Sequence, residues 1–153
     1  MIRKLIDINF FSIYFVENHP GFSQVKTIID EGLSGSYKII IPEIVPFRAF
    51  YILTTKWGIA KNLAKEVISE FIKNYSIPVY AGLKRETIIE AFRYSNELKH
   101  DIYDCYYLAL AKQEEASTIL TTDTDFDKLC KKIGLIYENP IPTEILRKFS
   151  AFK

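Results

Sequence analysis

The 153-residue chain has only two histidines, two cysteines and one tryptophan, and no excess of charge of either sign. The chain has 20 basic and 19 acidic side chains, so its net charge is near zero. Any binding of nucleic acid must therefore come from a local basic patch and not from the overall charge. Cys105 and Cys130 have neither a CxxC spacing nor a paired histidine, which predicts buried thiols in a reducing, cytoplasmic setting. No run of about 18 apolar residues is present, so we expect no signal peptide, no membrane span and no membrane partner.

Two classes of α/β protein are disfavoured by what the first strand lacks. No glycine-rich turn follows it, which argues against a dinucleotide-binding protein. Phosphoacceptor domains and haloacid-dehalogenase-like phosphatases need a second acid beside the first aspartate and a lysine late in the sheet. The stretch Asp7-Ile8-Asn9 has no second acid, and no lysine directly follows the apolar segment 118–121, so this class is the weaker alternative.

Short apolar segments alternate along the chain with longer segments whose apolar residues recur at helical spacing. Strands are predicted at 3–6, 38–41, 77–81, 118–121 and 135–137. Helices are predicted at 9–17, 22–33, from 42 or 46 to 56 or 57, at 59–75, 85–98, from 101 onward, at 125–132 and at 143–149. This alternation implies a three-layer α/β fold, with a mostly parallel sheet of four to five strands flanked by helices. No repeat or linker interrupts it, so residues 1–153 are expected to form a single domain.

Aspartates recur where a predicted strand ends or a predicted helix begins. Asp104 lies on a segment that is apolar nearly all round, so its carboxylate is buried unless it faces a cavity or a cation. The carboxyl ends of parallel strands are where open α/β sheets bind ligands, so Asp7 and Asp123 can converge with Asp104. Hard divalent cations such as Mg²⁺ or Mn²⁺ prefer carboxylate oxygens. We interpret these three acids as a metal-dependent site for phosphate chemistry.

Other charged or polar residues near these acids have ordinary structural explanations. Asp101 and Asp125 precede predicted helices, where an aspartate caps the helix as readily as it binds a metal. His19 lies in a Pro-Gly turn, and His100 lies at a helix start as a cap, a substrate contact or, preferably, a surface residue. Neither histidine is a candidate for metal-free cleavage.

Four segments, LIDINFF, PEIVPFRAFYIL, DIYDCYYLALA and ILTTDTDF, resemble in this order the motifs of PIN domains, in particular of VapC-type toxin ribonucleases. The resemblance covers nearly the whole chain. It implies a metal-dependent endoribonuclease using Mg²⁺ or Mn²⁺, a homodimer, and a VapB-like antitoxin as partner. It implies catalytic and metal-binding roles for Asp7, Asp104 and Asp123, assistance from Asp101 and Asp125, and support from Asn9 and Thr121.

One position departs from the family pattern. PIN domains usually carry a glutamate early in the helix after the second strand, and the matching position here is Arg48. The nearest glutamate, Glu43, is five residues earlier and points about 140° away on one helix. Two alternatives stay open. The site works with aspartates alone, or Arg48 forms an ion pair with them and displaces a cation, leaving a degenerate domain that binds RNA or protein.

Two further features bear on substrate and assembly. The lysines that follow Asp125 are the nearest candidates for contacts with the RNA backbone, although such a run is more often a solvated face. These are Lys128, Lys131 and Lys132. The aromatic residues of two segments exceed what a small domain buries, which predicts homodimerisation. They are Phe10, Phe11, Tyr14 and Phe15, and Phe47, Phe50 and Tyr51.

Overall fold

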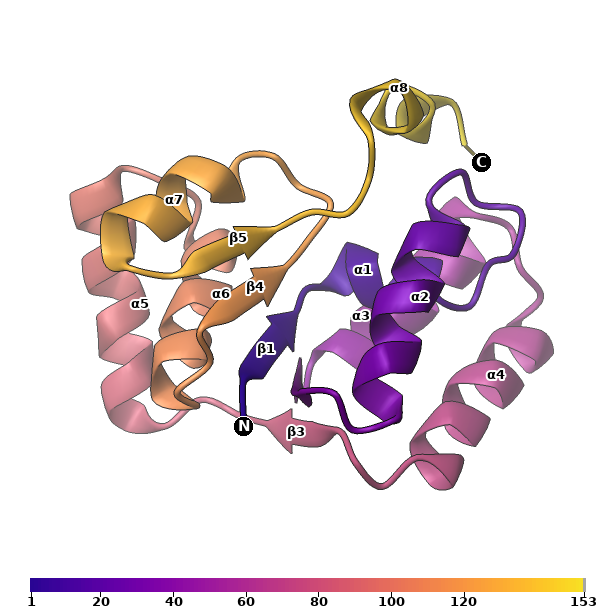
Figure 1. Cartoon of the computed structure of the whole chain (residues 1–153), viewed down its shortest axis with the longest axis horizontal. Coiled ribbons are helices and arrows are strands. Elements are labelled where there is room, and N and C mark those ends of the chain that lie inside the picture. The colour runs from indigo at the N-terminus through magenta and orange to yellow at the C-terminus, as the bar shows by residue number, and fades with distance from the viewer. Residues whose placement is uncertain (153) are drawn as a thin grey trace.

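A computed structural model describes residues 1–152, which form a five-stranded sheet with helices on both faces (Figure 1). The strand order is β3-β2-β1-β4-β5, and every neighbouring pair is parallel. The strands are β1 (Arg3–Ile6), β2 (Lys38–Pro42), β3 (Val79–Ala81), β4 (Thr118–Leu120) and β5 (Ile136–Glu138). The predicted α/β class is therefore confirmed, with a sheet that is parallel throughout the described residues.

Helices α1 to α4 lie on one side of the sheet and α5 to α7 on the other (Figure 1). Within residues 1–152, none of them is both long and apolar enough to cross a membrane. A π-helical turn (Ile52–Lys56) continues α3, and a 3₁₀ turn (Phe149–Ala151) follows α8. The bounds are α1 (Ile8–Ile13), α2 (Phe22–Leu33), α3 (Val45–Tyr51), α4 (Lys61–Asn74), α5 (Arg85–Leu98), α6 (Ile102–Gln113), α7 (Phe126–Ile133) and α8 (Thr143–Leu146).

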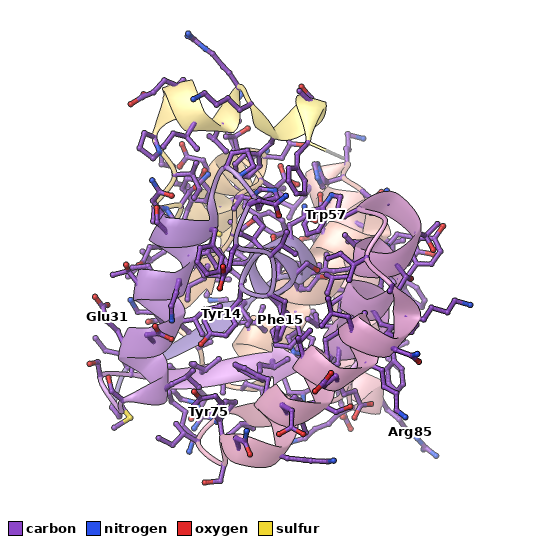
Figure 2. All side chains as sticks on the ribbon, turned by 90° about the vertical axis from the view of Figure 1, so that its right-hand side faces the viewer. Tyr14, Phe15, Glu31, Trp57, Tyr75 and Arg85 are labelled. Carbon is purple, nitrogen blue, oxygen red and sulfur yellow. The ribbon has the colours of Figure 1, made fainter. Side chains whose placement is uncertain are left out.

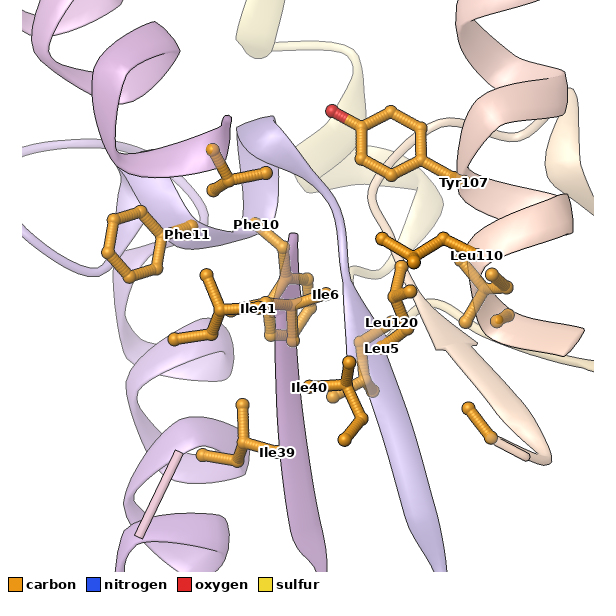
Figure 3. Packing of buried hydrophobic residues seen from close by; sticks show 14 of the residues in the cluster. Leu5, Ile6, Phe10, Phe11, Ile39, Ile40, Ile41, Tyr107, Leu110 and Leu120 are labelled. Atoms are coloured by element: carbon orange, nitrogen blue, oxygen red, sulfur yellow. The ribbon is translucent and has the colours of Figure 1, made fainter. Parts of the chain in front are cut away.

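The central strands are apolar on both faces, as expected for a parallel sheet covered by helices. Figure 3 shows Ile39 and Ile41 of β2 pointing to one side of the strand and Ile40 to the other. All three are fully buried. Helix α2 approaches β2 closely at Gly32, where a Cβ atom would lie 2.6 Å from Ile39 Cδ1. The buried, closely packed sheet is thus a rigid base for the loops at its carboxyl edge.

The chain changes direction between β1 and β4. It runs from β1 to β2 and β3, then returns across the sheet to β4 on the opposite side of β1. The loops that follow β1 and β4 therefore diverge, and such a switch point is where open α/β sheets bind ligands. Asp7 directly follows β1, and Thr121 to Asp123 follow β4. The topology itself brings these residues to one crevice.

Several predicted helices have the right position but a different buried face. Helix α4 buries Ala64, Ile68 and Phe71, whereas Leu63, an apolar residue of the same helix, is 52% exposed. Helix α5 has the predicted bounds, yet it buries the smaller Thr87 and Ala91 together with Tyr94. Its larger apolar residues, Ile88, Ile89 and Phe92, are exposed. Two elements are shorter than predicted. The first helix ends at Ile13 and not at residue 17, and the third strand begins at Val79 and not at residue 77.

The expected excess of aromatic residues is half absorbed by the core. Phe10 and Phe11 are fully buried. Phe71 of α4 meets the rings of Phe11, Tyr14 and Phe15 edge to face, on the side of the molecule shown in Figure 2. Phe47 and Tyr51 of α3 remain exposed, which leaves an apolar surface on that helix. Both cysteines are free and buried, as predicted.

Candidate functional site

Asp7 is the most enclosed acid of the crevice, with 3% of its surface exposed. It caps α1: the Phe10 N–H donates to Asp7 Oδ1 at 2.9 Å. The Thr121 hydroxyl donates to Asp7 Oδ2 at 2.5 Å. Burial is the main cause that raises the pKa of Asp7 to about 7; the two hydrogen bonds oppose it, and the charges of Asp123 and Asp104 add to it. A buried carboxylate of this kind favours a bound proton or a bound cation.

Thr121 connects the ends of β1 and β4. Its hydroxyl oxygen, fully buried, accepts a hydrogen bond from the Asp123 N–H at 2.9 Å while it donates to Asp7. Asp123 Oδ1 in turn accepts from the Asp125 N–H at 2.9 Å. The loop after β4 is therefore folded by its own side chains, and it holds Asp123 beside Asp7. Thr121 was expected to support the acids, and its hydroxyl forms hydrogen bonds with both Asp7 and Asp123.

Asp104 lies in the first turn of α6, half-buried, and its Oδ2 is 2.7 Å from His100 Nε2. Burial raises the pKa of Asp104; the hydrogen bond with His100 opposes this shift, and the charge of Asp123 adds to it. Asp104 and Asp123 both raise the pKa of Asp7 as well. The three predicted acids thus lie close enough for the charge of one to raise the pKa of another.

The tightest group of potential metal ligands is a different one. Within residues 1–152, it consists of His100, Asp104 and Asp125, whose ligand atoms all lie within 4.8 Å of one another. Asp7 and Asp123 are not part of this compact group. They follow β1 and β4, and the charges of Asp104 and Asp123 both act on Asp7.

The two acids with alternative capping roles behave differently. Asp101 Oδ1 accepts from the N–H groups of Tyr103 at 2.6 Å and Asp104 at 3.4 Å, so Asp101 is an ordinary cap of α6. Asp125 occupies the cap position of α7 without forming such a hydrogen bond. Its carboxylate lies with His100 and Asp104 instead. Capping therefore explains Asp101 but not Asp125.

His100 was expected to be a surface residue, but it belongs to this group. Its ring is half-buried and contacts Asp104. The spacing of four residues between His100 and Asp104 was the available signal, because residues four apart share a helical face. That signal was weak, since His100 lies before the helix begins.

Two of the three predicted lysines face this site. A hollow of about 450 Å³ is lined by His100, Asp125, Lys128 and Lys132, among others. Lys131 instead forms an exposed ion pair with Asp127 at 3.4 Å. The hollow is thus open to a ligand that carries both negative charge and metal-binding oxygens.

The family model described as PIN domain matches residues 4–132. The chain belongs to the PIN-domain family. Its fold is similar to Mycobacterium tuberculosis VapC20, a Sarcin-Ricin loop cleaving toxin, with a TM-score of 0.65 and 12% identity over 82% of this chain and 94% of that one. It is also similar to a chain of Rickettsia felis VapBC2 bound to a promoter DNA fragment, with a TM-score of 0.68 and 18% identity over 90% and 98%. No curated protein has significant sequence similarity to this chain.

In this PIN domain, neither candidate for the usual glutamate position joins the acids. Glu43 is exposed before α3, and its carboxylate packs on Gly82, where a Cβ atom would lie 2.6 Å from Oε1. The guanidinium of Arg48 is exposed and lies 5.9 Å from the centre of the Tyr103 ring. No ion pair between Arg48 and an acid is present within residues 1–152. The ion pair by which Arg48 was expected to neutralise the acids is therefore not formed in this part of the chain.

An apolar groove runs beside the PIN-domain acids, between α3, α5 and α6. It has a volume of about 280 Å³, and Arg48, Phe92, Tyr103 and Tyr107 are among the residues that line it. Burial is the main cause that raises the pKa of Tyr107; the charge of Asp7 adds to this shift and that of Arg48 opposes it, so Tyr107 is the residue of the groove that senses the acids. Asn9, the remaining predicted supporting residue, is exposed on α1.

Proposed function

We propose that this PIN domain is a metal-dependent endoribonuclease, the toxin of a toxin–antitoxin pair. The observation that carries the proposal is the convergence of Asp7, Asp104 and Asp123 at the switch point between β1 and β4. Membership of the PIN family and the fold shared with a Sarcin-Ricin loop cleaving toxin support it. A cytoplasmic location and a single functional unit over residues 1–153 are part of the same proposal.

The residues present fit a divalent cation such as Mg²⁺ or Mn²⁺. Asp7, Asp104 and Asp123 would hold it, with Asp125 assisting, and a buried carboxylate whose pKa is raised loses its cost of ionisation beside a cation. Asp101 contributes by fixing the start of α6. The ion supplies an activated water and positive charge at the phosphodiester.

The chain's own residues would orient the reaction. Thr121 and the Phe10 N–H hold both oxygens of Asp7, so its carboxylate keeps one direction during turnover. Lys128 and Lys132 would attract RNA phosphates into the hollow beside His100. Lys131, already paired with Asp127, would contribute less.

We propose two protein partners for the exposed apolar surfaces. A VapB-like antitoxin segment would occupy the apolar groove lined by Arg48, Phe92 and Tyr103, because another of its lining residues, Tyr107, is near enough to Asp7 to sense its charge. The similar Rickettsia felis chain comes from a VapBC2 structure, which supports such a pairing. A second copy of this chain would cover the separate groove of about 390 Å³ between α3, α4 and β3, which Phe47 and Ile72 help to line.

The decisive experiment measures cleavage of mixed RNAs with Mg²⁺ or Mn²⁺, in wild type and in Asp104→Asn. We expect metal-dependent cutting that EDTA abolishes and that falls at least about a hundredfold in the variant, since a group held at the reacting centre is lost. Asp30→Asn on α2 is the matched control, because Asp30 pairs with Lys26 on the surface and should retain full activity.

A degenerate domain that only binds RNA or protein is the second candidate function, and Arg48 at the usual glutamate position favours it. Absence of cutting with either metal, from protein shown to be folded, would support this alternative. Arg48→Glu would then be tested, because an acid at this position should restore metal binding if the missing glutamate is the cause.

A further inference from the structure

The backbone around His100 is held in a specific geometry. Helix α5 ends at Leu98, and its C-cap residue Lys99 lies in the left-handed region with φ of 52°, which is uncommon for a residue other than glycine. The His100 N–H donates to the Ser95 carbonyl at 3.2 Å, and the Ser95 hydroxyl donates to the His100 carbonyl at 2.7 Å. Both polar groups of the His100 main chain are therefore tied to α5, and the ring itself contacts Asp104 in the first turn of α6.

This geometry presents an imidazole nitrogen to two carboxylates from different segments. Nε2 of His100 lies 2.7 Å from Asp104 Oδ2, and a ligand atom of Asp125 completes the group within 4.8 Å. Asp125 lies at the start of α7, and its carboxylate forms no capping hydrogen bond with that helix. A simple ion pair between His100 and Asp104 needs no third carboxylate. The group matches a set of one nitrogen and two oxygen ligands.

We propose that His100, Asp104 and Asp125 bind a divalent transition-metal ion, with Mn²⁺ preferred over Mg²⁺. An imidazole ligand favours first-row transition metals, whereas Mg²⁺ keeps to oxygen ligands and water. The proposal deepens the proposed ribonuclease, because Asp104 belongs to both groups of acids, and it names the metal and one ligand.

The first test is pulsed electron paramagnetic resonance of Mn²⁺ added to untagged wild-type protein. Coupling to a ¹⁴N nucleus of imidazole is expected, and it should disappear in His100→Gln. The only other histidine, His19, cannot supply it, because its ring is buried among Trp57, Phe149 and Phe152. This readout needs neither RNA nor activity.

The second test compares metal affinities by titration of Mn²⁺ and by competition with Mg²⁺. His100→Gln should weaken Mn²⁺ binding by more than about tenfold, because even residues that only support a ligand cost that much, and should change Mg²⁺ binding far less. Asp125→Asn should also weaken Mn²⁺ binding. Asp127→Asn is the matched control on the same turn of α7, since Asp127 pairs with Lys131.

The outcomes separate this inference from the proposed function. Nitrogen coupling without any RNA cleavage supports the metal site and contradicts the nuclease. RNA cleavage with Mn²⁺ bound but without nitrogen coupling overturns the role of His100 and leaves the nuclease standing. Failure of wild-type protein to bind Mn²⁺ overturns the inference. If His100→Gln fails to fold, the wild-type spectrum and Asp125→Asn still decide it.

Discussion

Among single residues, Asp7 has the largest electrostatic consequence for stability. Its pKa is about 7 in the folded protein against an ordinary 3.8, chiefly because of burial. The folded state therefore holds a proton that the unfolded state loses, and Asp7 makes stability fall as pH rises from about 4 through about 7. In EDTA, Asp7→Asn should become more stable than wild type as pH rises, by up to about 4 kcal/mol at pH 8.

Urea unfolding of both proteins at several pH values between about 4 and 8 measures this prediction. The difference between them isolates Asp7, because His19 and the other titrating groups are present in both. A wild-type and variant difference that does not change with pH would contradict the buried, ionisable Asp7.

Thr121 is the second residue whose contacts lead to a prediction. Its hydroxyl is fully buried, donates to Asp7 and accepts from the Asp123 N–H. Thr121→Val preserves shape but leaves both partners unsatisfied, so the free energy of unfolding should fall by about 1–3 kcal/mol. Thr118→Val on the same stretch of chain is the control: Thr118 is also buried, but its hydroxyl only contacts that of Ser117, so a smaller loss is expected.

At the scale of elements, the C-terminal segment is attached through a buried histidine. The His19 ring lies against Phe149 and Phe152, which follow α8, and against Trp57. Burial lowers the pKa of His19 to about 4. Because this value is below the ordinary 6.5, the stability that neutral His19 contributes is present above about pH 6.5 and is lost as pH falls toward 4.

Acidification from pH 7 to about 4.5 should therefore loosen the segment of α8 and residues 149–152 before the sheet unfolds. Trp57 is the only tryptophan, so a red shift of its fluorescence measures the loss of these ring contacts. Gly21→Ala should give the same red shift already at pH 7, because its Cβ would lie 2.7 Å from Phe149 Cζ. His19→Asn should remove the pH dependence, and unchanged fluorescence in Gly21→Ala would contradict the proposed attachment.

At the scale of the whole molecule, α3 leaves apolar surface that its own chain does not cover. Phe47 is 74% exposed and Tyr51 54% exposed. If the proposed homodimer forms through this surface, Phe47→Glu should shift the mass in sedimentation toward that of a monomer, because it places a charge in an apolar interface. Ile136→Glu is the control: Ile136 is 59% exposed on β5, at the opposite edge of the sheet, and should leave the mass unchanged.

The class of fold could be predicted from local sequence patterns, and so could the positions of Asp7, Asp104 and Asp123. Continuous apolar segments such as 38–41 can only be buried between helix layers, and an aspartate after such a segment lies at the carboxyl edge of the sheet. Asp7 and Asp123 could be identified in this way. The position of Asp104 followed from the cost of burying an acid on an apolar helix. These inferences depend on local patterns, which a single segment carries in full.

The directions of the remaining side chains depend on contacts between segments that are distant in the chain. The direction of His100 depends on how α5 ends against α6, and that of Asp125 on the loop folded by Thr121 and Asp123. Glu43 packs on Gly82, 39 positions later in the chain, and Arg48 packs on Tyr103 rather than on an acid. Helical periodicity also could not show which apolar face of α5 is buried. Each of these side-chain directions depends on a contact between segments that are distant in the chain. The sequence of one segment alone therefore does not contain the information needed to predict it.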